Sequence, residues 1–234
     1  MQEQSEKAAV VIVAAGSSRR MLGRDKLWTP LRGRITLART LDVFQASPLI
    51  ETIVLVTSTE RLTDTIDLCE KEHWQKVTAI IPGGQRRQDS VAIGLDLVAT
   101  TSPSCKWVMI HDAARPFVTE TMLQEGLLSA QVHQACVAAV PVKDTIKQVQ
   151  GNLIHATLNR SQLWMIQTPQ IFSFPLIHHA HHEPIAQEDF TDDVALLERL
   201  GHTVAIFQGS YANIKITTQE DLLIAEALLQ GATQ

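Results

Sequence analysis

The sequence has little cysteine and no long apolar run. Its three cysteines, Cys69, Cys105 and Cys136, are odd in number and more than thirty residues apart, a spacing that fits neither a disulfide framework nor a zinc motif. The apolar run at residues 8–15 follows acidic residues and is too short for a membrane-spanning helix or an ordinary signal peptide. We therefore expect a cytoplasmic protein with reduced thiols and no membrane association.

An excess of positive charge is also missing. The chain has 20 lysine and arginine residues against 25 acidic residues, which gives a formal net charge of -5. No overall cationic field therefore draws the protein to nucleic acid or to an anionic membrane. Any anionic substrate must be met by local basic residues.

Two nucleotide-binding fingerprints are absent as well. Neither G-x-G-x-x-G nor G-x-x-x-x-G-K-[ST] occurs in the chain, and no acidic residue ends the second predicted strand, where the ribose of a dinucleotide would need one. These absences disfavour a dinucleotide-dependent reductase.

The pattern of apolar runs predicts an α/β fold. Short β-branched runs alternate with stretches of helical period, as in a mostly parallel sheet flanked by helices. The predicted strands are residues 10–13, 52–56, 77–81 and 107–110, and the predicted helices are residues 35–45, 61–72, 89–99 and 120–133. Because 234 residues with 45% hydrophobic content can bury a full core, we expect a single domain over residues 1–234.

From residue 136 the alternation of predicted strands and helices stops. Runs at residues 137–142, 145–149 and 153–158 follow one another, and Gly151 and Asn152 form a turn between the last two, which predicts a hairpin. We expect residues 142–164 to form a protruding β-arm, whose unpaired edges a second copy would cover in a homodimer. Trp164 and Met165 are interpreted as packing residues and not as a base-stacking platform. The chain then returns to helix, strand and helix at residues 192–200, 203–207 and 219–229.

Two glycine-containing loops follow predicted strands. The first, AAGSSRRM at residues 14–21, lies where open α/β sheets bind ligands, and its small side chains allow backbone N–H groups to approach phosphates. With its basic residues this loop is long enough to wrap a triphosphate; the alternative is a solvated basic loop. The second, PGGQRRQDS at residues 82–90, opens a helix whose N-terminus adds positive potential to that of Arg87. The alternative for this motif is an ordinary capped turn.

A third motif, IHDAARPF at residues 110–117, ends the fourth predicted strand with an acid and a base, Asp112 and Arg115. A carboxylate beside a triphosphate loop is well placed to hold Mg²⁺, which prefers a carboxylate together with phosphate oxygens and water. The alternative is a buried Asp112–Arg115 ion pair that shapes the turn.

Histidines cluster between residues 178 and 182. His178 and His182 share a helical face, which is a spacing that metal sites use. No matching carboxylate motif surrounds them in the sequence, so the pattern favours a solvent-facing helix.

The motifs together resemble a known family, the 2-C-methyl-D-erythritol 4-phosphate cytidylyltransferases. Besides the three already quoted, the resemblance depends on VKDTIK at 142–147, LNRSQLW at 158–164 with QTPQ at 167–170, TDD at 191–193 and NIKIT at 213–217. The seven motifs stand in the family's order and approximate spacing over nearly the whole chain. The resemblance implies a Rossmann-like nucleotidyltransferase fold, a homodimer with a β-arm, CTP as cosubstrate, Mg²⁺ as cofactor, and a place in non-mevalonate isoprenoid biosynthesis.

The resemblance also implies roles for individual residues. The residues expected to act on the triphosphate and the acceptor phosphate are Arg20, Lys26, Arg160 and Lys215. Those expected to bind CTP are Ala14, Ala15, Gly16, Gly83, Gly84, Arg87, Ser90 and Ala113. Those expected to bind the acceptor are Asp112, Arg115, Thr145, Thr168 and Thr191, with Asp112 also the metal ligand and Arg115 and Thr145 expected to reach across the dimer.

The first loop departs from the family pattern at two places. The family has Pro-Lys with the lysine seven residues after the second arginine, whereas this chain has Asp25-Lys26 and is one residue shorter. Ser18 stands where a glycine is common, so the backbone there is expected to avoid positive φ. Two other functions stay open on the sequence, a ribitol 5-phosphate cytidylyltransferase and a nucleotide-sensing module without catalysis.

Overall fold

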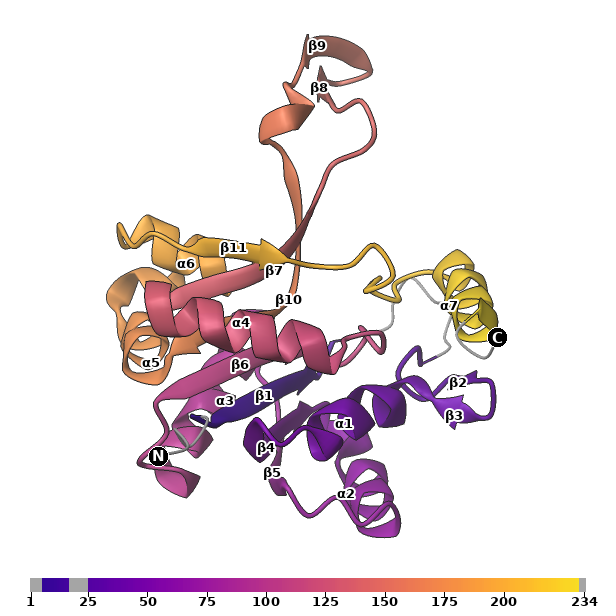
Figure 1. The fold of residues 1–234 in the computed structure, drawn as a ribbon, viewed down its shortest axis with the longest axis vertical. Coiled ribbons are helices and arrows are strands. Elements are labelled where there is room, and N and C mark those ends of the chain that lie inside the picture. The colour runs from indigo at the N-terminus through magenta and orange to yellow at the C-terminus, as the bar shows by residue number, and fades with distance from the viewer. Residues whose placement is uncertain (1–5, 17–24, 232–234) are drawn as a thin grey trace.

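The computed structural model describes residues 6–16 and 25–231 and is built around one large sheet (Figure 1). Its seven strands stand in the order β11-β7-β10-β6-β1-β4-β5. Their bounds are β1 Ala8–Ala14, β4 Ile50–Thr57, β5 Val77–Pro82, β6 Trp107–Asp112, β7 Ala135–Pro141, β10 Trp164–Ser173 and β11 Ala205–Gln208. Strand β10 runs antiparallel to β6 and β7, and the other four pairs are parallel. The predicted mostly parallel sheet is therefore confirmed.

Helices cover both faces of this sheet. One apolar core joins the sheet to α1 (Thr36–Ala46), α2 (Leu62–Lys71) and α4 (Glu120–His133), and a second joins it to α3 (Arg87–Thr101), α5 (Phe174–His182) and α6 (Asp193–Arg199). Strand β1 lies between them, with Val10 and Ile12 in the first core and Ala9 and Val11 in the second. Because both faces of β1 are buried, its sequence is continuously apolar and does not alternate with polar residues.

The first turn of α3 begins two residues earlier than the predicted helix at 89–99. Arg86 and Asp89 form a reciprocal cap, in which the Arg86 backbone N–H donates to Asp89 Oδ2 at 3.0 Å and the Arg86 guanidinium pairs with the same carboxylate at 2.6 Å. A side chain that satisfies backbone donors at a helix start extends the helix toward its cap. Arg87 therefore lies in the first turn of α3, at the edge where the parallel strands end.

The predicted hairpin is confirmed as β8 (Lys147–Gln150) paired with β9 (Leu153–Thr157), followed by the short helix η3 (Arg160–Gln162). Gly151 turns the chain with a φ of +59°, which glycine adopts at little cost. The hairpin stands away from the sheet on extensions of β7 and β10 (Figure 1). We call residues 142–163 the arm. Its apolar side chains Leu153 and Ile154 are 76% and 67% exposed.

Strand β10 was not predicted. Its pairing with β7 shifts register between Ile166 and Gln170, and Pro169 within that interval has no N–H to give to a sheet. Because Pro169 lies in a polar stretch, the sequence did not predict this strand, although β10 lies between β7 and β6 in the sheet. Two further short strands, β2 (Pro30–Leu31) and β3 (Arg34–Ile35), were also missed.

The last helix, α7 (Gln219–Gly231), packs beside these short strands. Leu31, Ile216 and Ala225 form a small separate core there. Two more short 3₁₀ helices are η2 (Thr59–Arg61) and η4 (Pro184–Gln187). Among the described residues, no helix combines the length and the apolar character needed to cross a membrane.

Candidate active site

The candidate site lies where β1, β4, β5 and β6 end. Because these strands are parallel, their carboxyl ends meet at one edge, which is where open α/β sheets bind ligands. Two cavities of about 540 and 450 Å³ open there. The lining residues that they share are Ala14, Ala15, Gly16, Leu27 and Gly84. Residues 14–16, which begin the first loop, and Gly84 of the Gly83-Gly84 turn therefore line both cavities.

The Gly83-Gly84 turn packs tightly against the first loop. A Cβ atom on Gly83 would lie 2.5 Å from the Ala15 Cβ, closer than real side chains allow, so only glycine fits at this approach. The Gly83 N–H donates to the Thr57 carbonyl at 2.8 Å, and the Gly84 N–H donates to Ser90 Oγ at 3.1 Å. Ser90 therefore stabilises the turn. Its contact with CTP stays a prediction.

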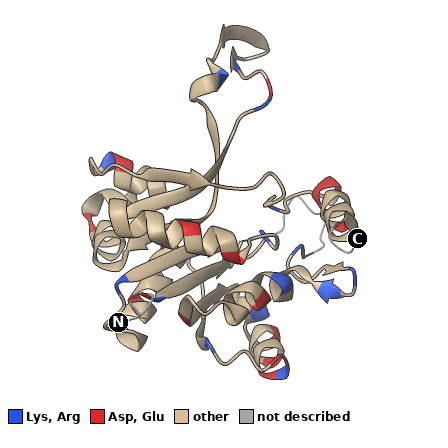
Figure 2. Ribbon diagram, viewed as in Figure 1, with Lys and Arg blue, Asp and Glu red and all other residues tan. Residues whose placement is uncertain are grey.

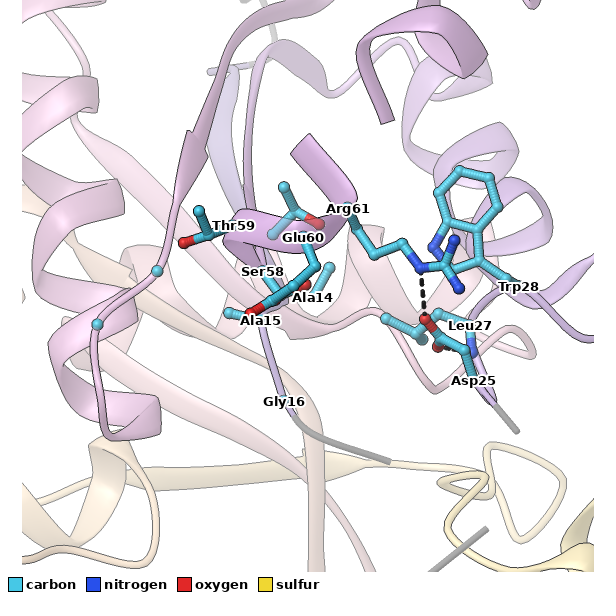
Figure 3. A pocket seen from close by; sticks show the side chains of 13 residues that line it. Ala14, Ala15, Gly16, Asp25, Leu27, Trp28, Ser58, Thr59, Glu60 and Arg61 are labelled. Carbon is cyan, nitrogen blue, oxygen red and sulfur yellow. Dashed lines mark hydrogen bonds and ion pairs between the residues drawn. The ribbon is translucent and has the colours of Figure 1, made fainter. Parts of the chain in front are cut away.

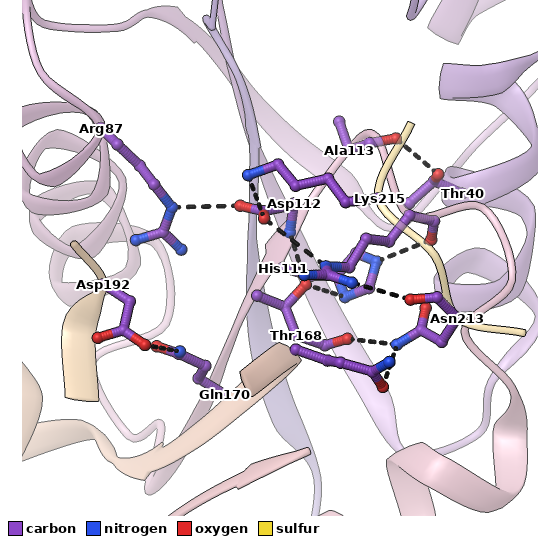
Figure 4. Close-up of polar contacts among 12 residues, drawn as sticks. Thr40, Arg87, His111, Asp112, Ala113, Thr168, Gln170, Asp192, Asn213 and Lys215 are labelled. Atoms are coloured by element: carbon purple, nitrogen blue, oxygen red, sulfur yellow. Dashed lines mark hydrogen bonds and ion pairs between the residues drawn. The ribbon is translucent and has the colours of Figure 1, made fainter. Parts of the chain in front are cut away.

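Asp112 is the charged centre of the second cavity (Figure 4). It ends β6 and is only 7% exposed. Lys215 Nζ lies 2.8 Å from its Oδ2, and Arg87 Nε donates to its Oδ1 at 3.2 Å. Burial opposes ionisation of Asp112, but the charges of Arg87 and Lys215 outweigh it and hold the pKa of the carboxyl well below its usual range. Arg115, predicted as its alternative partner, is farther away at 3.8 Å.

Arg87 is held from behind by a second carboxylate. Its Nη1 donates to Asp193 Oδ2 at 2.7 Å, and His181 Nε2 lies 3.1 Å from the other Asp193 oxygen. Burial opposes the charge of Arg87, but Asp193 and Asp112 outweigh it and raise the pKa of the guanidinium. Arg87 lines the second cavity with its charge balanced by two acids, so it positions Asp112 as much as it attracts phosphate.

Asp193 is a site-shaping residue that sequence reasoning did not select. Its side chain is 1% exposed, and burial of an aspartate needs a paired cation. The signal was present in the motif TDD at 191–193, where the predicted residue was Thr191. Thr191 itself is exposed and does not line either cavity.

Lys215 is placed by the segment that carries it. The Ile216 N–H donates to the Ala114 carbonyl at 2.9 Å, and the Asn213 side chain donates to the Thr168 carbonyl at 2.9 Å. Asn213 is fully buried, and its own carbonyl accepts a hydrogen bond from Arg115 at 2.8 Å. The segment is therefore fixed on both sides, which directs Lys215 toward Asp112. Arg115, which was predicted to reach across the dimer, is hydrogen-bonded here to Asn213 of its own chain.

Thr168 and His111 form a buried layer beneath Asp112. The Asp112 N–H donates to Thr168 Oγ1 at 3.0 Å, Thr168 Oγ1 lies 3.1 Å from His111 Nδ1, and His111 Nε2 lies 3.1 Å from the Arg115 carbonyl. Since a carbonyl only accepts, Nε2 carries the ring proton and Nδ1 accepts from the threonine hydroxyl. Burial lowers the pKa of His111 to about 4. Thr168 is thus placed to support Asp112, and its predicted substrate contact stays a prediction.

Ala113 continues this support on the other side of Asp112. Its N–H donates to the Val13 carbonyl at 3.0 Å and its own carbonyl accepts from Thr40 Oγ1 at 2.8 Å. The residue is fully buried. Ala113 therefore joins the ends of β1 and β6 behind the cavity.

The first loop returns to the described part of the chain at Asp25. Its Oδ1 accepts from the Leu27 N–H and its Oδ2 from Arg61 Nε, both at 3.1 Å (Figure 3). The guanidinium of Arg61 stacks over the Trp28 ring at 5.1 Å from its centroid. Asp25 therefore fixes the turn that leads through Lys26, a lining residue of the second cavity. Arg20, predicted to contact the triphosphate, lies outside the described residues.

The two remaining predicted residues lie on the arm. Thr145 and Arg160 are exposed and line neither cavity. Arg160 Nη1 donates to the Lys143 carbonyl at 2.9 Å. Figure 2 shows basic residues on the arm, well away from the large sheet. Within one chain, the structure brings Lys26, Arg87, Asp112 and Lys215 together, but it does not bring Arg160 and Thr145 to them.

Comparison with known proteins decides the family. The family described as 2-C-methyl-D-erythritol 4-phosphate cytidylyltransferase matches residues 8–231. The chain belongs to this family. A 2-C-methyl-D-erythritol 4-phosphate cytidylyltransferase from Dehalococcoides mccartyi (strain ATCC BAA-2266) is 47% identical over 227 residues, which cover 97% of each chain. Another, from Alkaliphilus oremlandii, is 45% identical over 236 residues and covers the same share of both chains.

Solved structures agree with the family assignment. The 4-diphosphocytidyl-2C-methyl-D-erythritol synthase of Anaerococcus prevotii superposes with a TM-score of 0.83 at 30% identity and covers 97% of both chains. The 2-C-methyl-D-erythritol 4-phosphate cytidylyltransferase of Thermus thermophilus gives a TM-score of 0.78 at 29% identity, over 96% of this chain and 99% of that one. The predicted family and the predicted α/β nucleotidyltransferase fold are therefore confirmed, and these relatives give the ribitol alternative no added support.

Proposed function

We propose that this member of the cytidylyltransferase family transfers CMP from CTP to 2-C-methyl-D-erythritol 4-phosphate, releasing pyrophosphate, in the non-mevalonate route to isoprenoid precursors. The observation that carries the proposal is the second cavity, where a loop of small residues and the start of α3 face Lys215 and Asp112. Such a site offers backbone donors for phosphates on one wall and a lysine on the other.

The proposed reaction needs position and charge more than covalent chemistry. An oxygen of the acceptor's phosphate attacks the α-phosphorus of CTP in line, the new P–O bond forms, and the bond to the leaving pyrophosphate breaks. Two polyanions must approach each other in a chain of net charge -5. Lys26 and Lys215 offset their repulsion at the wall of the cavity, because preorganised charges stabilise the transition state without reorganising. Arg20 and Arg160 are proposed to add to this charge.

A magnesium ion fits the donor chemistry at Asp112. The carboxyl is ionised, lines the second cavity and is a single acidic group, and Mg²⁺ usually takes one or two carboxylates together with phosphate oxygens and water. In the proposal Asp112 would hold the ion, which would supply positive charge against the CTP phosphates. Lys215 and Arg87 balance the same carboxylate, and Lys215 lines the cavity in which the proposed acceptor phosphate would lie.

The position of Arg160 and Thr145 supports a homodimer in which the arm completes the site of the other copy. Both residues are exposed at the arm and absent from the cavities of their own chain. The arm also carries exposed apolar side chains, including Val149 at 59% exposure, and a contiguous exposed apolar surface on a hairpin edge is typical of an interface. One domain over residues 1–234 and a cytoplasmic location remain part of the proposal.

Pyrophosphate release tests the activity. The full chain is incubated with CTP and Mg²⁺ and with either 2-C-methyl-D-erythritol 4-phosphate or ribitol 5-phosphate, and pyrophosphate is measured over time. We expect release with the methylerythritol acceptor and a much lower kcat/KM with ribitol 5-phosphate. Preference for ribitol 5-phosphate would replace the proposed acceptor, and CTP binding without release with either acceptor would indicate a nucleotide-sensing module.

A mixing experiment tests the arm. Arg160→Ala and Lys215→Ala are each expected to be inactive as homodimers. If the arm serves the partner's site, a heterodimer of the two has one site with both residues intact, so an equimolar exchanged mixture recovers about a quarter of wild-type turnover. If Arg160 serves its own chain, every site in the mixture lacks one residue and no activity returns.

A further inference from the structure

A second cluster of metal-ligating side chains lies outside the substrate site. Helix α5 presents His178 and His182 one turn apart, and α3 presents Asp96 opposite them. His178 Nε2 lies 3.0 Å from Asp96 Oδ1, and His182 Nε2 lies 3.2 Å from the same oxygen. One ligand atom from each residue lies within 4.8 Å of the others. The carboxylate that the local sequence lacked is therefore supplied by a distant helix.

A backbone hydrogen bond orients the ring of His182 toward Asp96. Its Nδ1 lies 2.8 Å from the His178 carbonyl, and because a carbonyl only accepts, Nδ1 is the donor of this bond. The Nε2 of the same ring faces Asp96 Oδ1 at 3.2 Å. Fixing of the distal N–H by a backbone carbonyl is the arrangement that metal-bound histidines show.

The two nitrogen–oxygen distances at Asp96 suit a small tetrahedral ion. With bonds of about 2.0–2.1 Å to histidine nitrogen and carboxylate oxygen, two ligands of a tetrahedral zinc ion lie roughly 3.3 Å apart. The two nitrogen–oxygen distances at Asp96 are 3.0 and 3.2 Å. We propose that Asp96, His178 and His182 bind a zinc-class divalent ion with a fourth position open to water. Two imidazoles and one carboxylate favour zinc and its first-row neighbours over Mg²⁺.

The helices around the cluster suit it to holding α5 against α3. The ring of His178 stacks on Phe174 with centroids 5.2 Å apart, and Phe174 belongs to the core that α5 shares with α3. His181, between the two ligands in sequence, points the other way and contacts Asp193 behind Arg87. An ion on the outer side would therefore fix the helix pair whose inner side supports the substrate site, without using any residue of that site.

Zinc titration of the full chain tests the proposal. Purified metal-free protein competes with a chromophoric chelator for Zn²⁺ alone, with no nucleotide or acceptor present. We expect one tight site in the wild type, at least a tenfold weaker site in His182→Ala and Asp96→Asn, and no change in His179→Ala. His179 is the matched control because it lies on the same helix, is exposed and pairs with Glu183 on the other side. All three side chains are at least half exposed, so folding is not at risk.

Two outcomes separate this site from Asp112. Asp112→Asn is expected to keep the tight zinc site, and thermal unfolding of the wild type is expected to shift upward by about 5 to 10 °C at a zinc concentration near 100 times Kd. The shift should vanish in His182→Ala and persist in His179→Ala. Equal zinc binding by the wild type and His182→Ala would overturn the proposal, and so would loss of binding in Asp112→Asn with full binding in Asp96→Asn.

Discussion

The cavity at the strand ends and the arm are built in opposite ways. At the cavity, Asp112 is buried and its charge is balanced within the chain by Lys215 and Arg87. On the arm, the charged Arg160 and the apolar Ile154 are both exposed. Burial of an ion pair is costly unless its geometry is fixed, so the cavity is preorganised, whereas the arm presents Arg160 and its apolar side chains to the solvent.

The difference separates residues that form a site from residues that complete one. Lys215 is fixed by hydrogen bonds on both sides of its segment, and it needs no other molecule to face Asp112. Arg160 donates to the Lys143 carbonyl beside it on the arm. Each of the four predictions that follow changes one of these regions and compares the result with a matched control.

The largest effect is expected from Lys215→Ala. Removing one preorganised charge at a transition state costs about 3 to 4 kcal/mol, or roughly two to three orders of magnitude in kcat/KM. Pyrophosphate release measures the loss, and circular dichroism measures folding, which should be unchanged because Lys215 is partly exposed. Lys106→Ala is the control, since Lys106 is exposed and precedes the opposite end of β6. Turnover close to the wild type in Lys215→Ala would remove this residue from the mechanism.

His111 should make stability depend on pH in a way that the arm does not. Its pKa is lowered from 6.5 to about 4 by burial, so between these values the unfolded chain binds a proton that the native protein does not. The free energy of unfolding should therefore rise with pH across this window, by about 3 kcal/mol in total, and fall as pH drops toward 4. Urea unfolding at several pH values measures the slope.

The slope is expected to decrease by about one proton in His111→Asn. A loss of stability that is the same at every pH does not affect this comparison, because only the slope of the free energy of unfolding against pH is compared. His155→Asn is the reference from the arm, where the side chain is exposed, and its slope should match the wild type. An unchanged slope in His111→Asn would show that His111 is not the buried neutral group assigned here.

Much of this cavity could be predicted from the sequence, but the ion pair between Asp112 and Lys215 could not. The small-residue loop and the Gly83-Gly84 turn were predicted to meet, because parallel strands end at one edge and each motif follows a strand. The pairing of Asp112 with Lys215 was not, since the two are far apart in the chain and only the fixed segment around Asn213 brings them together. The same holds for Asp96 and His182, which come from helices that the sequence does not relate.

The arm was predictable as a hairpin and not as a location for site residues. Its turn at Gly151 and its apolar runs gave the strands β8 and β9 with boundaries close to those observed. The family motifs placed Arg160 and Lys215 together on the acceptor, yet one chain holds them in different regions. A motif identifies a residue's role without saying which copy of the chain supplies it, and so the separation became visible only in three dimensions.

A smaller effect is expected from Ile154→Asp on the arm. Burying an isoleucine contributes about 2 kcal/mol, so loss of that contact in each copy should weaken a dimer and lower turnover at dilute enzyme. Sedimentation over a range of concentrations measures the dimer constant. Leu223→Asp makes the same change at an exposed leucine of α7 and should leave the dimer intact. An Ile154→Asp protein that associates like the wild type would place the interface elsewhere.

The smallest effect is expected at Asp25, where the chain departs from the family pattern. Asp25→Ala removes the acceptor for the Leu27 N–H and the partner of Arg61. A partly exposed ion pair contributes about 1 kcal/mol or less, so the KM for CTP should rise less than tenfold while kcat stays near the wild-type value. Asp64→Ala is the control, because Asp64 is the other partner of Arg61 and does not line the cavities. Turnover in Asp25→Ala as low as in Lys215→Ala would contradict this prediction. The turn at Asp25 would then take part in the reaction itself and would not merely support the cavity.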